Sequence, residues 1–201
     1  MLVSGVGIVR TRRDGWAWLP ALLLAALCAG CPAMAITQAS IQAASATADD
    51  RSYEQQLSDD ETKAEIEKQL LTNAASLAAK VNVDVYLGRV MLTGAVPDDG
   101  SRRMAMTLTR EEVDDATVYD DIQVVPDGSS MGSNFVANEE LGARLLQAEG
   151  LGSQSFQHRV VNGTAYIMGE TRTDQQVETA RQTALGTSGV QDVVTHILVS
   201  P

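Results

Sequence analysis

The sequence predicts an α+β protein built as a tandem repeat of two small α-β-β-α-β modules. Residues 63–124 recur as residues 138–199, with an offset of 75 (138 − 63) and no gaps. This period is too long for a solenoid unit and there are only two copies, so the repeat indicates two domains, each with its own core. We expect each module to be a three-stranded mixed sheet covered by two helices. The repeated residues include Leu70-Leu71 as Leu145-Leu146, Val118 as Val193, Ile122 as Ile197 and Val124 as Val199.

The first module is expected at residues 58–125. Ser58 and Glu61 have the spacing of a capping box and predict a helix start, followed by Ile66 and Leu70 on one face. Alternating valines over residues 81–85 predict a half-buried strand. The predicted turn is at Gly88 and the end of the return strand at Gly94. Residues 101–112 follow as a helix with Met104 and Leu108 on one face, and a last strand lies over residues 118–124.

The second module is expected at residues 133–201, after a linker at 126–132. Ser133 or Asn134 is the predicted cap of its first helix. Asn162-Gly163 is a strong signal for a two-residue hairpin, and Gly169 corresponds to Gly94. Thr173 and Gln176 predict a second capping box, and residues 193–199 form the last strand. Each module has about 65 residues, near the lower limit for an independent core, so mutual support between the modules is one interpretation.

The composition excludes some classes of function. The chain has 201 residues, a formal net charge of −11 and only 4% aromatic residues. An acidic surface repels the phosphate backbone, so nucleic acid is not an expected partner. The charge also disfavours broad adhesion to anionic lipid, and any membrane contact is expected to be local. The sequence does not indicate an oligomeric state.

The N-terminal residues have the pattern of an export signal. Arg10, Arg12 and Arg13 form a basic region before an apolar run over residues 16–29, which is shorter than a membrane-spanning helix requires. Cys28-Ala29-Gly30-Cys31 resembles a bacterial lipobox, although Cys28 stands where leucine is commoner. This interpretation makes residues 1–30 a signal peptide of lipoprotein type and Cys31 the acylated N-terminus. Residues 31–57 would then be a flexible tether.

A second cleavage site competes with the lipobox. Ala33-Met34-Ala35 is an A-x-A site that would release a soluble periplasmic protein beginning at Ile36. Neither route leaves a pair of cysteines in the mature chain, so a structural disulfide and a cysteine-based zinc site are both excluded.

The order of these motifs resembles the BON domain, a bacterial module. The shared features are a capped helix with a Leu-Leu end, an alternating strand, a glycine turn, an Ala-centred helix and a closing V-x-x-x-I-x-V strand. The chain is most similar to dual-BON outer-membrane lipoproteins of the DolP (YraP) type, and soluble periplasmic dual-BON proteins of the OsmY type are the nearest alternative. The supporting segments are Asp50-Arg51-Ser52, Gln56, Asp59 and Val118-Tyr119-Asp120-Asp121-Ile122.

The resemblance implies a non-catalytic lipoprotein of the outer membrane that faces the periplasm. It also implies binding of anionic phospholipid through the second module and a role in envelope integrity, with no cofactor. Residue 32 is Pro rather than Asp, so no inner-membrane retention signal is evident. Two departures stand against it: four arginines and seven acids give the second module a charge of 4 − 7 = −3, and its first helix has no Trp at its start.

Phe135 and Val136 are the candidate membrane-contact residues. Adjacent residues on a helix are about 100° apart, so one of the two side chains is expected to lie outside the core. It could dip into the acyl boundary of a membrane as a small wedge. The alternative is that both residues pack against the first module or form a helix staple.

Other polar groups favour ordinary structural roles. His158 and His196 are the only histidines, and strand parity places them on different sides of the sheet, so no metal site is expected. Six acids within residues 111–121 lack the glycine and the alternation of a calcium loop, and a solvated face is expected. Arg102, Arg103 and Arg110 are expected to balance these acids. No nucleophile and base motif is recognisable, so an enzyme is not expected.

Two hypotheses about function therefore remain. The first is a lipid-anchored envelope protein that binds phospholipid and supports outer-membrane integrity. The second is a soluble periplasmic stress-response protein that acts through protein–protein contacts. Acylation of Cys31 favours the first, and a mature N-terminus at Ile36 favours the second.

Overall fold

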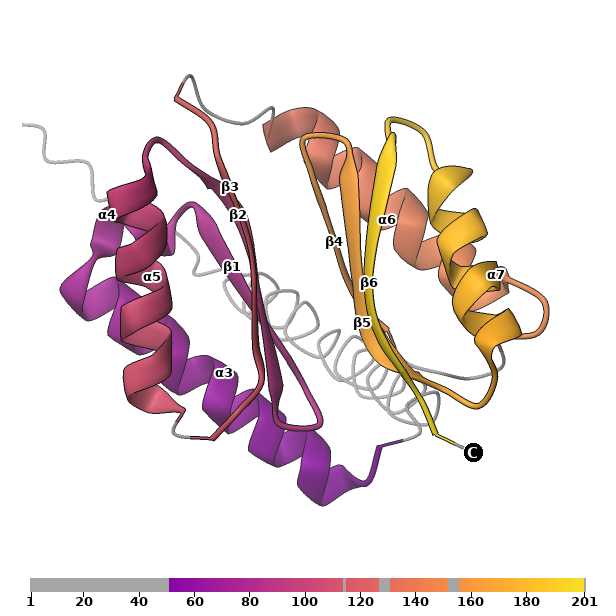
Figure 1. The fold of residues 1–201 in the computed structure, drawn as a ribbon, viewed down its shortest axis with the longest axis horizontal. Coiled ribbons are helices and arrows are strands. Elements are labelled where there is room, and N and C mark those ends of the chain that lie inside the picture. Colours follow the sequence, from indigo (N-terminus) through magenta and orange to yellow (C-terminus); the bar gives the residue numbers. More distant parts are fainter. Residues whose placement is uncertain (1–50, 114, 127–130, 152–155, 201) are drawn as a thin grey trace, which may run out of the picture. The chain divides into compact units, whose positions relative to one another are not determined.

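The computed structural model describes residues 51–113, 115–126, 131–151 and 156–200, and it contains two three-stranded sheets with helices (Figure 1). The first module contains α3 (Tyr53–Asn73), α4 (Ala75–Ala78), β1 (Val81–Tyr86), β2 (Arg89–Val96), α5 (Asp99–Glu112) and β3 (Val118–Val124). The second contains α6 (Met131–Gln147), β4 (Gln157–Val161), β5 (Thr164–Thr171), α7 (Asp174–Leu185) and β6 (Asp192–Val199).

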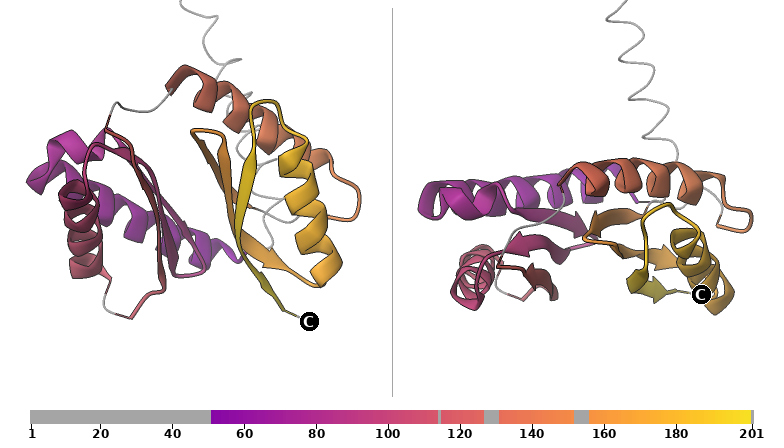
Figure 2. Two further views of the ribbon diagram at one scale, coloured as in Figure 1. Left: turned by 45° about the horizontal axis from the view of Figure 1, so that its top comes forward. Right: turned by 90° about the horizontal axis from the view of Figure 1, so that it is seen from above.

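Both sheets have the same topology. In the first, β1 pairs antiparallel with β2, and β2 pairs parallel with β3. In the second, β4 pairs antiparallel with β5, and β5 pairs parallel with β6. Helices α3 and α5 cover one face of the first sheet, and α6 and α7 cover one face of the second (Figure 2). This confirms the predicted α+β fold of two modules with mixed sheets.

Each module has its own apolar core between helices and sheet. The first core contains Ile66, Leu70, Val83, Val85, Val90, Leu92, Ala105 and Ile122 among its members. The second contains Leu141, Leu145, Val160, Ala165, Ile167, Ala180 and Ala184. The two sets occupy matching positions of the repeat, because the same helix and strand periodicities direct the same positions inward.

The first helix of each module begins earlier than the sequence predicted. Helix α3 starts at Tyr53, and its capping box is formed by Ser52 and Gln55 rather than by Ser58 and Glu61. The predicted tether, residues 31–57, therefore includes the first turn of a helix. Ser52 with Gln55 and Ser58 with Glu61 have the same capping-box spacing, so the local sequence does not distinguish them. The helix runs through residues 58–61, and the upstream pair therefore forms the cap.

Helix α6 likewise begins at Met131, so Asn134 lies inside the helix and does not cap it. The side chain of Asn134 instead accepts a hydrogen bond from the backbone N–H of Asn162, at 2.9 Å. Helix α7 begins as predicted, with Thr173 accepting from the N–H of Gln176. In a capping box the Gln176 side chain would accept from the backbone N–H of Thr173. It accepts instead from the backbone N–H of Arg172.

The glycines fall into two groups. Gly88 and Gly163 have positive φ and lie in the two-residue turns after β1 and β4, each following a non-glycine residue that also has positive φ. The sequence predicted that Gly94 and Gly169 end their strands. This is wrong, because both glycines lie inside β2 and β5. Gly94 has a φ of +133°, and a Cβ there would collide with the backbone oxygen of Lys80. It marks a close approach of two backbones.

Two predictions about side-chain burial are also wrong. Met104 is exposed, whereas Ala105, Leu108 and Thr109 form the buried face of α5. The outward residues of β1 were expected to be half-solvated, yet Asp84 and Tyr86 are buried. Their burial has a tertiary cause, because the face of the first sheet that the helices leave uncovered packs against the second module.

Candidate functional site

The contact between the two modules is an apolar cluster of side chains from the helix-free faces of both sheets. Tyr86, Met91 and Ala95 come from the first module, and Val161, Tyr166 and Met168 come from the second, all of them buried. Leu87, Tyr119, Val125 and Val194 pack around them. Because both faces of each sheet are covered, the strands carry apolar residues at positions that a half-exposed sheet would leave polar.

Residues at equivalent repeat positions meet across this contact. The guanidinium of Arg159 donates two hydrogen bonds to the carboxylate of Asp84, at 2.8 and 2.9 Å. His196 Nε2 lies 2.7 Å from Asp121 Oδ2, and the two residues are again 75 positions apart. Contact between equivalent positions is what a local two-fold relation produces. Two pairs of equivalent positions therefore face each other across the contact.

A buried arginine adds a third polar contact between the modules. Arg89 donates to the backbone oxygens of Gly169 and His196, both at 2.8 Å, and its guanidinium lies over the ring of Tyr86. The imidazole of His196 stacks on Tyr119 with ring centroids 3.8 Å apart. The sequence analysis did not identify Asp84, Arg89 or Arg159 as contact residues. The one signal was that Asp84 and Arg159, at matching positions of the repeat, carry opposite charges.

The hairpin turns are held by side chains of the first helices. The buried carboxylate of Asp59 accepts from the N–H groups of Leu87 and Gly88, at 2.8 and 2.9 Å, and pairs with Arg51. Asn134, 75 residues later, holds the second turn through Asn162. Both helix starts are therefore fixed to a sheet, which positions the residues that follow Asn134.

Phe135 and Val136, the predicted membrane-contact residues, follow Asn134 on α6, and both side chains are exposed, at 68% and 64%. Phe135 also borders a groove of about 220 Å³ between the modules, together with Lys80, Gly94 and Arg159. Neither side chain is buried against the first module, so the alternative in which both pack there is wrong. Leu146, near the other end of α6, is 72% exposed.

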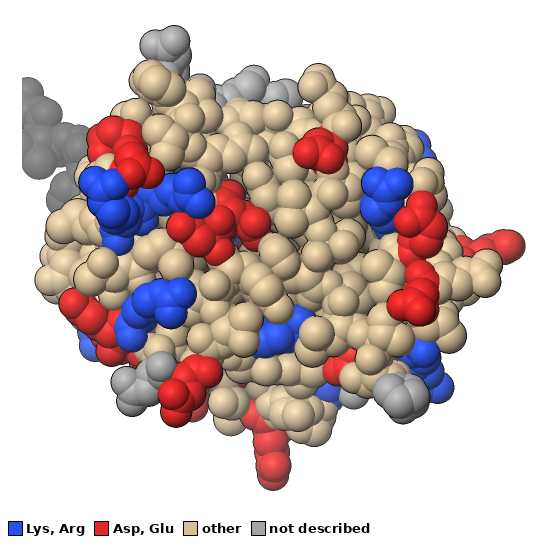
Figure 3. Space-filling model, viewed as in Figure 1, with Lys and Arg blue, Asp and Glu red and all other residues tan. Residues whose placement is uncertain are grey.

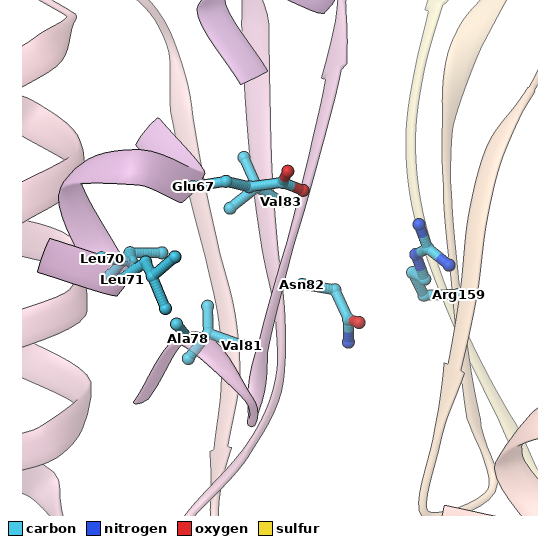
Figure 4. Close-up of a pocket in the computed structure, with 8 residues that line it drawn as sticks. All are labelled: Glu67, Leu70, Leu71, Ala78, Val81, Asn82, Val83 and Arg159. Atoms are coloured by element: carbon cyan, nitrogen blue, oxygen red, sulfur yellow. The ribbon is translucent and has the colours of Figure 1, made fainter. Parts of the chain in front are cut away.

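A second hollow, of about 350 Å³, lies between α3 and the facing strands of the two sheets (Figure 4). The side chain of Asn82 points from β1 towards Arg159 on β4, and Glu67 extends above it. Apolar side chains, with Leu70, Leu71 and Val81 among them, share the walls with the polar side chains already named. Arg159 is already paired with Asp84, so this hollow does not present a free cation.

Most basic side chains of the second module are neutralised by close acids. Arg144 pairs with Glu140, Arg181 with Glu178, and Arg159 with Asp84. In the first module Arg102 pairs with Asp120, and Arg103 with Asp99. The blue and red groups of Figure 3 accordingly lie next to each other instead of gathering into one basic patch on that face. This arrangement does not favour purely electrostatic binding of anionic lipid.

The two histidines lie on opposite faces of the second sheet, as strand parity indicated. His158 faces α6, where a Cβ on Gly142 would come within 2.7 Å of its Nε2. Burial is the main cause that lowers the pKa of His158. His196 faces the first module. Among the described residues, no group of three or more histidine, cysteine, aspartate or glutamate side chains is arranged to hold a metal ion.

Cys31, the predicted lipidation residue, and the whole predicted signal peptide lie outside the described residues. Within residues 51–200, excepting the gaps, no helix has the length and apolar character needed to cross a membrane.

These features define a class of protein, namely a pair of repeated α+β modules joined through the free faces of their sheets. Residues 58–126 and 135–201 each match the model of the BON domain. The chain belongs to the BON domain family. Modules of this family are associated with phospholipid binding and with envelope or stress proteins, and they are generally non-catalytic.

Three matches to known proteins have low sequence identity. An uncharacterised protein from the gshII 5′ region of Anaplasma centrale is 22% identical over 122 residues, which are 59% of this chain and 81% of that protein. The structure of CdsD, a structural protein of the type III secretion system of Chlamydia trachomatis, is 13% identical with a TM-score of 0.29 and covers 71% of this chain. This chain covers 64% of that structure, which is less than two thirds. A structure of the CdsD C-terminal domain is 12% identical with a TM-score of 0.30, and the match covers 71% of this chain and 67% of that one.

Proposed function

We propose that this protein is a non-catalytic envelope lipoprotein, anchored in the outer membrane through Cys31, that binds phospholipid through the start of α6 and supports membrane integrity. The observation that carries the proposal is the exposure of two adjacent apolar side chains, Phe135 and Val136, at 68% and 64%. Asn134 fixes this part of α6 to the second hairpin turn, so the helix that carries the two side chains is anchored to the sheet. The family association with phospholipid supports this assignment.

The binding energy would come mainly from apolar contact. The second module has a charge of −3 and most of its arginines are paired. Burying one large apolar side chain contributes about 1.5–3 kcal/mol, which corresponds to weak binding for an isolated module. An acyl chain on Cys31 would make this contact intramolecular and raise its effective concentration. We therefore expect the anchor and the Phe135–Val136 contact to act together.

The anchor is tested by intact mass of the protein purified from membranes. We expect a diacylglyceryl or triacyl adduct on Cys31 that is lost in Cys31→Ala. A mass beginning at Ile36 in the periplasmic fraction would contradict the anchor. That outcome would support the second hypothesis, a soluble stress-response protein acting through protein contacts.

The lipid contact is tested by flotation with phosphatidylethanolamine/phosphatidylglycerol liposomes. The double variant Phe135→Ser/Val136→Ser should lose binding, and raised salt should change binding of the unaltered protein little. Leu146→Ser is the matched control, because Leu146 is as exposed and on the same helix. Equal losses in the double variant and the control would show that α6 has no specific contact at its start.

A further inference from the structure

In the described part of the chain, the last strand of each sheet lies at an edge of that sheet. Among the strands that the structure describes, β6 pairs only with β5 (Figure 1). Ser200 N–H donates to the oxygen of Thr171, so residues of even number in β6 direct their backbone groups to β5. Backbone groups alternate along a parallel strand. Thr195, Ile197 and Val199 therefore present their N–H and C=O groups at the free edge.

The corresponding edge of the first sheet is closed. Arg102 Nε lies 3.0 and 3.1 Å from the carboxylate oxygens of Asp120, and its Nη2 reaches the backbone oxygen of Asp120 at 3.4 Å. The same carboxylate accepts from the backbone N–H of Ile122 at 3.4 Å. Side chains thus occupy the edge groups at the middle of β3. The charge of Asp120 also discourages pairing with another strand.

The second module lacks this closure. The residues 75 positions after Arg102 and Asp120 are Val177 and Thr195, neither of which carries a charge. Within the described part of the chain, no side chain bonds to the edge backbone groups of Thr195, Ile197 or Val199. Only the start of β6 is capped, where Asp192 accepts from the N–H of Val193. Leu198 and Val199 are also exposed, at 46% and 43%. An uncharged free edge with exposed apolar residues is a pairing surface.

We propose that β6 pairs antiparallel with β6 of a second copy of this chain, about a two-fold axis at Ile197. This register uses the three uncapped residues, with Ile197 opposite Ile197 and Thr195 opposite Val199 of the other copy. Residues 193–200 carry no acid and no Lys or Arg, so self-pairing places no like charges opposite each other despite the net charge of −11. The two three-stranded sheets become one six-stranded sheet.

The test measures sedimentation velocity of the full-length protein in detergent over a concentration series, with hydrogen exchange at each end of the series. We expect a monomer–dimer equilibrium, and protection of the Ile197 and Val199 amides only at high concentration. Transplanting the closure of β3 with Val177→Arg/Thr195→Asp should weaken dimerisation by about tenfold or more, because pairing then leaves edge groups unsatisfied and buries charge.

The converse variant is the matched control. Arg102→Val/Asp120→Thr opens the edge of β3, so it should retain the dimer and add larger species. Circular dichroism shows whether each variant is folded. A protein that is monomeric at every concentration would overturn the proposal. A dimer that persists unchanged in folded Val177→Arg/Thr195→Asp would also overturn it, because the contact would then lie elsewhere.

Discussion

At the scale of single residues, the two modules carry different residues at the matching repeat positions that contact each other. The contact between the modules brings position 84 against position 159 and position 121 against position 196. Identical residues at such positions would place like charges together. The chain has Asp84 against Arg159 and Asp121 against His196 instead, so the two partners of each pair can form hydrogen bonds to each other.

The Asp84–Arg159 pair gives the first prediction. Asp84 is 1% exposed, and Lys63 lies 3.6 Å from its carboxylate as a weaker partner. Arg159→Met should cost about 3 kcal/mol of unfolding free energy, because it leaves a buried charge with poor compensation. The swap Asp84→Arg/Arg159→Asp should recover part of this loss. Urea denaturation measures both. A swap that is no better than the single variant would mean that packing, not the pair, sets the cost.

His158 gives a prediction about pH. Its pKa is lowered first by burial, so the folded protein favours the neutral ring. Protons then bind more readily to the unfolded chain, whose histidine pKa is about 6.5. The contribution of His158 is therefore complete above about pH 6.5 and falls as the pH drops further. Thermal melts at pH 7.5 and pH 5 should show a larger loss for the unaltered protein than for His158→Gln. Identical losses would exclude this histidine as the cause.

At the scale of elements, glycine positions set how closely strands approach their neighbours. The positive φ of Gly88 serves a hairpin turn with open space around it, whereas the positive φ of Gly94 occurs inside β2 against the backbone of Lys80. The residue preferences of tight turns allowed Gly88 and Gly163 to be predicted as turn glycines. Nothing in the local sequence distinguishes Gly94 as a close contact, because the neighbouring backbone comes from another part of the chain.

This difference predicts unequal costs of substitution. Gly88→Ala should cost about 1 kcal/mol, because only the left-handed conformation opposes it. Gly94→Ala should cost more than about 3 kcal/mol or prevent folding, because a backbone has to move as well. Equilibrium denaturation compares the two variants. Similar costs would mean that the approach to Lys80 relaxes easily.

At the scale of the whole molecule, the shared cluster couples two small cores. Tyr86, Met91, Tyr166 and Met168 are buried only because the sheets pack together. Cores of about 65 residues are marginal alone, so we expect the described modules to unfold in one cooperative transition. Met168→Lys should split it into two in scanning calorimetry, since a buried unpaired charge weakens the contact and leaves each core intact. Two transitions in the unaltered protein would contradict this coupling.

The number of modules, their α-β-β-α-β order, the mixed sheets and most of each core could be predicted from the sequence alone. Repetition, alternation and turn chemistry are local properties, and they can be read without knowing what lies nearby in space. Three features could not be predicted and depend on tertiary packing: the burial of Asp84 and Tyr86, the anchoring of the turns by Asp59 and Asn134, and the exposure of both Phe135 and Val136. These features depend on which faces of two similar modules meet, and residues 75 positions apart share no local signal that they are in contact.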